Sequence, residues 1–439
     1  MATTIESLYP QRPGNVGPVF HWLAMPVFAL LMVFNAAAIG VVLSLSMALH
    51  VGRRLLERIP GVSTGSSAIA SAYHRQVQRL ANRVLKDPRD EPILAAAITL
   101  AWTAYPVLIV QLIIGEPSWV LALLFYACVF GPNIRGFART FSSMHQEGHR
   151  IGGVFKRPSL MEKLTGNSFL YMYLCLPMGL TPHAAAHLQQ HHRENAGPLD
   201  VYATARYDHA SVRDFLVYMV REVMYQQLLV SPYLYFRSKR KPAQMRSMIV
   251  SNLVHLSLFA LLAWYSLPIA VLFMLVPWCA SNFLMGVIHW AQHAFYGEQG
   301  DPRDFMVNTV TLLEKPVNAF NEGYHVCHHH WENVHWSESP ALFERIKPEM
   351  KAAGSIVFRD YGVIDLFLNL MLRRFDAMAD KLEWWEPLSH EQKVELLKRR
   401  AAPAPIAAHE LRHQRRAAAV SAAARAQAPD LDTEGCRQP

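Results

Sequence analysis

Histidine is the residue type in this chain whose number and spacing could do chemistry, because thirteen of its 21 copies gather in clusters between His145 and His335. The first cluster reads His145-Gln-Glu-Gly-His149. An i, i+4 spacing places both imidazoles on one face of a helix. Imidazole nitrogen binds iron, zinc, copper or nickel, so this face predicts a transition-metal site.

The second cluster continues the four-residue spacing. His183, His187 and His191 would stack three rings on one face of an α-helix, and His192 would point about 100° away. These residues predict a second helix that presents imidazoles to a metal.

The third cluster lies more than 130 residues further along the chain and reads His325-Val-Cys-His328-His329-His330, with His335 five residues further on. His293 ends a long apolar run before it, so the clusters would approach a metal from several directions. His289 stands one helical turn before His293 at the end of the same apolar run. Five others have no histidine at ligand spacing and are expected to be structural: His209, His255, His390, His409 and His413.

Other metal sites fit the spacing poorly. A zinc protease needs HExxH, but the glutamate of the first cluster comes one position late for that motif. Structural zinc usually recruits cysteine, and only Cys327 is close to a cluster. Soluble di-iron bundles use two ExxH motifs, whereas this chain has one, from Glu322 to His325. The pattern favours an all-histidine centre with more than one metal ion.

The composition indicates that membrane helices position these clusters. Of the 439 residues, 52% are hydrophobic, and the mean hydropathy is +0.10, which favours a membrane protein over several soluble domains. The net charge is +8, but the basic residues flank apolar runs and crowd the C-terminus. Anionic lipid is therefore the expected partner, and no nucleic acid is expected. The five cysteines form no CxxC pair and are expected to be reduced.

Apolar runs long enough to cross a bilayer predict an N-terminal span and two helical hairpins. The run Trp22–Val51 is interpreted as one span. The runs Ile93–Ile114 and Trp119–Asn133 form the first hairpin, and the runs Met248–Tyr265 and Pro268–Ile288 form the second. Short turns that contain glycine or proline separate the two runs of each hairpin.

Positive charge predicts the orientation of the hairpins. Their turns contain no lysine or arginine, whereas their open ends carry Arg135, Arg139, Arg150, Lys156, Arg157, Arg237, Lys239, Arg240, Lys241 and Arg246. The open ends, with the histidine clusters, are therefore expected in the cytoplasm. The polar stretch Arg53–Arg89 is expected to be a cytoplasmic loop. The shorter apolar runs Phe169–Leu180 and Val363–Leu372 are expected to be interfacial or core helices.

These elements predict an all-α fold, a multi-pass transmembrane helical bundle with two hairpins and an N-terminal span. A helical cytoplasmic cap would carry the histidine clusters. Residues 1–21 are a polar N-terminal segment, and residues 22–92 hold the first span and a basic cytoplasmic loop. Residues 93–398 form the domain with the histidines, and residues 399–439 an Ala/Arg/Pro-rich tail expected to be disordered.

Around these histidines the sequence resembles the membrane fatty acid desaturase and hydroxylase superfamily, whose members carry three histidine boxes in this order. The resemblance covers roughly residues 93–345 and includes three wider segments: His191-His192-Arg-Glu-Asn-Ala-Gly-Pro-Leu-Asp200, Gln292-His293-Ala-Phe295 and Asn321-Glu-Gly-Tyr-His325-Val-Cys-His328-His329. It implies a non-haem di-iron centre reduced by an external electron donor of the ferredoxin or cytochrome b5 type with its reductase.

By position, the resemblance implies nine metal ligands: His145, His149, His187, His191, His192, His293, His325, His328 and His329. Five neighbours in the sequence are candidates to orient the ligand imidazoles by hydrogen bonds, or are solvated surface groups: Glu147, Glu194, Asp200, Asn321 and Glu322.

The expected function is O2-dependent desaturation of a fatty acyl chain by two iron ions. A hydroxylase, or an oxidative decarboxylase that forms a terminal alkene, is an alternative in the same superfamily. A histidine-rich metal-binding or metal-transport membrane protein is a more remote alternative. Transporters usually hold polar ligands within their spans, near the midplane. Here most of the histidines follow the spans, which favours an enzyme.

Overall fold

The computed structural model describes residues 18–59, 62–150, 153–157, 187–196, 200, 202–221, 230–297, 304–313 and 319–404. Several of the expected features lie outside the described residues: His183, His409, His413, the run Phe169–Leu180 and the chain after Ala404.

The first hairpin forms as predicted. Helices α4 (Glu91–Trp102) and α5 (Ala104–Ile114) make its outward limb, and α6 (Trp119–Phe130) returns. Helix α5 ends at Gly115, whose φ of 79° is a left-handed conformation that favours glycine. Ser118 then caps α6 by accepting a hydrogen bond from the backbone N–H of Leu121.

The second hairpin also forms as predicted, with α14 (Pro242–Tyr265) as its outward limb. Its return limb is continuous and consists of α15 (Leu267–Ala270), the π-helix η5 (Val271–Leu275) and α16 (Val276–Gln292). The Tyr265 hydroxyl donates a 2.7 Å hydrogen bond to the Leu112 carbonyl, which joins the tips of the two hairpins.

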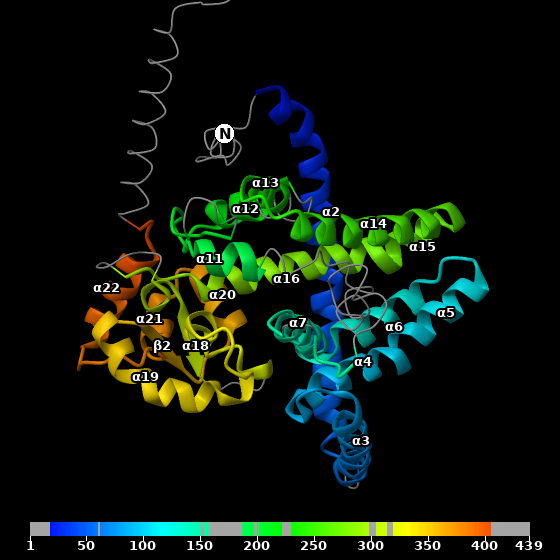
Figure 1. Ribbon diagram of the computed structural model, residues 1–439, viewed down its shortest axis with the longest axis horizontal. Helices are drawn as coiled ribbons and strands as arrows, with labels where there is room; N and C mark the ends of the chain where they lie inside the picture. Colours follow the sequence, from blue (N-terminus) through cyan, green and yellow to red (C-terminus); the bar gives the residue numbers. More distant parts are fainter. Residues whose placement is uncertain are drawn as a thin grey trace, which may run out of the picture.

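The apolar run near the N-terminus forms one helix, α2 (Pro18–Leu56), as the sequence predicts. Among the described residues, five segments are long and apolar enough to cross a membrane: Ala36–Leu56, Pro88–Ile114, Trp119–Gly148, Pro242–Tyr265 and Leu267–Gln292. Helix α2 nevertheless runs across the direction of the hairpin helices in Figure 1, and packs on α6 and α16. The stretch expected as a loop after it contains a helix, α3 (Val62–Val84), and the short η1 (Pro88–Asp90).

A sharp bend follows the first hairpin and aims the next helix at the site. Gly131 has a φ of 66° and leads into η2 (Pro132–Ile134), where the Ser46 hydroxyl of α2 accepts a 2.8 Å hydrogen bond from the Ile134 N–H. A Cβ at Gly136 would lie 2.7 Å from the Val129 carbonyl oxygen, so only glycine allows this approach. Helix α7 (Arg135–Gly148) therefore leaves the hairpin in a new direction.

Short elements from residue 304 onward form a cap, which Figure 1 shows in yellow to red at the end of the molecule away from the hairpin tips. Its elements are α17 (Phe305–Asn308), β1 (Val310–Leu313), η6 (Ala319–Asn321), α18 (His325–His330), η7 (Trp336–Glu338), α19 (Ser339–Ala353), β2 (Ile356–Arg359), α20 (Val363–Met371), α21 (Phe375–Ala379) and α22 (His390–Ala401). Two further helices, α12 (Val212–Arg221) and α13 (Val230–Ser238), precede the second hairpin.

The cap departs from the all-α expectation in one detail. Strands β1 and β2 pair in parallel, with Val310 opposite Ile356. Seven of their eight residues are buried, and apolar β-branched residues such as Val310 and Val357 favour such a strand. The rest of the described chain is mostly helical, so the expected class holds.

The described chain stays packed beyond residue 399, where the tail is predicted to start, up to Ala404. Helix α22 runs to Ala401, Arg400 is buried, and the Ala404 N–H donates a 2.8 Å hydrogen bond to the Ala205 carbonyl. The apolar run near residue 363 forms α20, which buries Leu366 and Leu370 and exposes Leu368, as expected of a core or interfacial helix. The predicted domain limits otherwise stay predictions.

Candidate metal centre

The first histidine pair lies at the end of α7. His145 and His149 are both buried, and their ring centroids are 5.1 Å apart, as the i, i+4 spacing predicts. Phe137 and Phe141 stack on the same helix, with ring centroids 5.7 Å apart. The apolar residues anchor α7 in the core, and the last turn presents the imidazoles.

The second cluster corrects the expected helical face. His187–His191 form a π-helix, η3, and α11 (His192–Glu194) follows it. A π-helix repeats at i+5 rather than i+4, so His192 and not His191 faces His187. The Nε2 atoms of His187 and His192 are 3.0 Å apart. The local backbone thus divides this cluster between two sites.

The third cluster occupies the short helix α18. His325, His328 and His329 fall at i, i+3 and i+4, which places their rings on neighbouring positions of one face. His330 points elsewhere: it is exposed and lies against Trp331, with ring centroids 4.2 Å apart. The helix therefore separates three interior histidines from one surface histidine.

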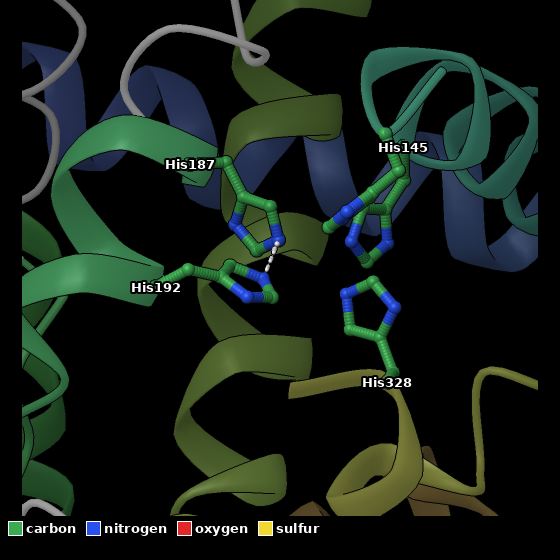
Figure 2. A group of neighbouring side chains, drawn as sticks. His145, His187, His192 and His328 are labelled. Atoms are coloured by element: carbon green, nitrogen blue, oxygen red, sulfur yellow. Dashed lines mark hydrogen bonds between the residues drawn. The ribbon is translucent and has the colours of Figure 1, made fainter. Parts of the chain in front are cut away.

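The interior histidines gather into two groups, each with its possible ligand atoms within 4.8 Å of one another. The first group is His145, His149, His187, His192 and His328. The second group is His191, His293 and His329, and the His325 Nε2 lies 3.2 Å from the His293 Nε2 beside it. Figure 2 shows rings of the first group that come from three separate segments and point toward one another. All nine sequence-predicted ligands thus lie in this cluster.

The nitrogen spacing fits metal coordination. Bonds of about 2.1 Å to imidazole, with a right angle between neighbours, place two ligand nitrogens about 3.0 Å apart. The His187–His192 and His293–His325 pairs have Nε2 separations of 3.0 and 3.2 Å. The residues present therefore fit a transition-metal ion in each group.

The protonation of the third cluster also suits metal binding. Burial, assisted by neighbouring imidazoles, lowers the pKa of His325, His328 and His329 well below the usual histidine value. These imidazoles are neutral near pH 7, the form that ligates a metal. Burial raises the pKa of the Cys327 thiol to about 12, so this cysteine stays protonated and is a poor ligand.

Two of the five candidate orienting residues contact ligand histidines. The buried Asp200 carboxylate accepts a 2.9 Å hydrogen bond from the His191 Nδ1 and two more from the N–H groups of Ala196 and Tyr202. The Glu322 Oε1 lies 3.0 Å from the His145 Nδ1. With the His191 Nδ1 held in this way, its Nε2 is left to face a metal.

The other three candidates have different surroundings. Glu194 forms a 3.2 Å ion pair with Lys239, and the Asn321 amide donates to the Trp336 carbonyl. Glu147 is buried on α7. The structure therefore gives Glu194 and Asn321 partners other than the ligand imidazoles.

Sequence reasoning missed a backbone group that orients His293. The His293 Nδ1 lies 3.0 Å from the Asn308 carbonyl oxygen, which can only accept, so Nδ1 carries the proton and Nε2 is free to ligate. His289, one turn earlier on α16, is buried beside Tyr202, with ring centroids 4.4 Å apart. In the part of the chain that the structure describes, His289 belongs to neither group.

An apolar cavity of about 290 Å³ lies beside the cluster, between α7 and α16. Its wall contains Phe141, one turn before His145, together with Ile288 and Glu322. Its lining also includes the exposed Asp365 at the start of α20. The cavity therefore lies beside the first imidazole group, with Phe141 and Glu322 between them, and extends toward the surface at Asp365.

The family model described as fatty acid desaturase matches residues 117–361, more than half of the chain. The chain belongs to the fatty acid desaturase family. All nine predicted ligand histidines fall within the matched residues, as does the cavity wall on α7 and α16. A search of the curated proteins finds no match. Members of the desaturase family use iron, and the apolar helices together with this family identify the chain as a membrane protein.

Proposed function

We propose that this desaturase-family protein is a membrane-bound, O2-dependent di-iron enzyme that introduces a double bond into a fatty acyl chain. The single observation that carries the proposal is the pair of adjoining buried imidazole groups next to an apolar cavity. When bound, two iron ions would activate the co-substrate O2, which supplies the oxidising power to break a methylene C–H bond.

The protein itself would hold and align the reactants. Phe137, Phe141 and Leu284 line the cavity with hydrocarbon surface, which suits an acyl chain and excludes water. Asp200 and the Asn308 carbonyl hold the Nδ1 protons of His191 and His293, which fixes both rings.

The proposal extends to the surroundings of the enzyme. The chain would cross the membrane several times, and the basic residues at the open ends of the hairpins would place the histidines on the cytoplasmic side. A ferredoxin or a cytochrome b5 with its reductase would deliver electrons there. The substrate would arrive as a fatty acyl lipid.

Lipid profiling of cells that express the chain tests the reaction, with His328→Ala as the inactive control. The proposal predicts fatty acyl chains with one additional double bond in the wild-type cells only. A new hydroxyl group or a shortened terminal alkene would replace desaturation by another oxidation of the same class. Identical lipids in both cell lines, although wild-type protein holds iron, would contradict the proposed activity.

A further inference from the structure

Asp90 is a buried carboxylate that precedes α4 and lies outside the matched residues 117–361. Its side chain is only 2% exposed. Three polar groups face it: the His335 Nε2 at 3.2 Å, the Trp336 Nε1 at 3.1 Å and the Arg150 Nε at 3.5 Å. A buried carboxylate needs such partners, because an uncompensated charge in the interior is costly.

These three partners belong to the ends of two histidine segments. Arg150 directly follows His149 in the chain. His335 and Trp336 lie at η7, a few residues after α18. Asp90 thus joins the end of the first histidine segment to the end of the third, although it lies 246 residues from Trp336 in the sequence.

The charged residues around Asp90 form a more exposed rim. Arg89 pairs with Asp87 and with Glu338, each at 2.7 Å, and about half of the Arg89 and Glu338 side-chain surface is exposed. Exposed pairs of this kind stabilise a fold little. The buried contacts of Asp90 therefore hold the segments together more than the rim does.

The two segments that Asp90 joins meet in the first imidazole group. The His328 ring lies 4.3 Å from the His145 ring and 4.4 Å from the His149 ring, measured between centroids. The second group contains no histidine of the first segment. A change in the distance between the first and third segments thus separates ligands of the first group from one another, but it separates no ligands of the second.

We propose that Asp90 is a positioning residue that fixes the first and third histidine segments against each other and so completes the first imidazole group. The inference rests on the proposed function insofar as these imidazoles hold iron. It assigns a role in the metal centre to a residue at the start of α4, which precedes the matched part of the chain.

The test compares full-length, detergent-purified wild type with Asp90→Asn. Asparagine keeps the size of the side chain and an oxygen for the Trp336 N–H, but removes the charge that faces Arg150 and His335. Glu338→Gln is the matched control, since it neutralises a carboxylate of the exposed rim. Iron titrations followed by Mössbauer spectroscopy report each iron site separately, and hydrogen exchange of the metal-free proteins reports the segments without iron.

The proposal predicts that Asp90→Asn weakens one iron site about 10- to 100-fold and leaves the other near its wild-type affinity. In metal-free Asp90→Asn, hydrogen exchange of the backbone amides should be faster than in the wild type near residues 143–150 and 331–338, but not near His293. Glu338→Gln should match the wild type. If Asp90→Asn does not accumulate, His335→Gln removes one of the three contacts and should shift the same site in the same direction.

The outcomes separate this proposal from the proposed function. A wild type that binds no iron contradicts the proposed function. Hydrogen exchange of the metal-free proteins then still tests whether Asp90 holds the first and third histidine segments together. If the wild type binds iron, and Asp90→Asn has the same iron affinity and the same hydrogen-exchange rates as the wild type, the role of Asp90 is overturned. Equal weakening of both iron sites overturns it too, because that result indicates general destabilisation.

Discussion

Replacement of Asp200 by asparagine should weaken metal binding through His191. The carboxylate is fully buried and accepts hydrogen bonds of 2.9 Å from the His191 Nδ1, the Ala196 N–H and the Tyr202 N–H. All three groups donate to it. Asparagine replaces one of the two acceptor oxygens by an NH2 group, which must then face a donor.

The size of the effect follows from which oxygen is lost. If asparagine keeps an oxygen at the Oδ2 position, only the Tyr202 hydrogen bond is lost; in the reverse orientation, the hydrogen bonds of both His191 and Ala196 are lost. Each hydrogen bond to a charged group contributes about 1.5–3 kcal/mol. For the metal, loss of a carboxylate behind a ligand histidine weakens affinity about 10- to 100-fold, which equals about 1.4–2.8 kcal/mol.

Equilibrium competition with a colorimetric Fe(II) chelator measures this loss on detergent-purified protein. Glu194→Gln is the control, because Glu194 is also a carboxylate close to His191 in the sequence but pairs with Lys239. We expect its iron affinity to change less than about twofold, as for other partly exposed ion pairs. Wild-type affinity in Asp200→Asn, or equal losses in both variants, would refute the reasoning.

Three further predictions concern a ligand, the cavity and a buried histidine. His328→Ala should lose iron and reduce activity more than roughly 100-fold, the largest effect expected from a residue that only orients a ligand. The control His330→Ala changes an exposed histidine and should keep both iron and activity. Iron analysis and product yield measure the two effects. Ile288→Trp should keep its iron but reduce turnover of long acyl chains at least about tenfold relative to short ones, because it fills the cavity; a chain-length series measures the ratio. Burial lowers the pKa of His209 to about 3, so stability is full above the unfolded value of about 6.5 and falls as the pH drops toward 3. His209→Asn, which lacks this titration, should therefore lose about 2 kcal/mol less than wild type between about pH 7.5 and pH 5 in unfolding experiments.

Periodicity and turn residues predict much of this fold from sequence. The two hairpins follow from apolar runs interrupted by glycine or proline, and α7 presents His145 and His149 as a 3.6-residue repeat requires. These features depend on local sequence, so they can be read from it.

The second cluster shows where periodicity fails. The π-helix at His187–His191 adds one residue to the turn and sends His191 to the other imidazole group. Asp200 rather than Glu194 contacts the His191 imidazole. This contact depends on the backbone after His191, where Asn195 and Ala196 adopt positive φ and Asp200 lies against the His191 Nδ1. Neither backbone conformation has a clear sequence signal.

Long-range contacts set the remaining features. The Asn308 carbonyl that orients His293 is a backbone group, which any residue type at that position would supply. The contact of Asp90 with Trp336 joins residues that are 246 positions apart in the sequence. Strands β1 and β2 are only four residues long, and their pairing depends on the cap around them. Such contacts emerge only when the chain is folded.

Metal analysis of the purified protein tests the central claim most directly. The two imidazole groups predict about two iron ions per chain, seen as two iron sites in the Mössbauer spectrum. Stoichiometric zinc without iron, in protein purified from iron-replete cells, would contradict the account.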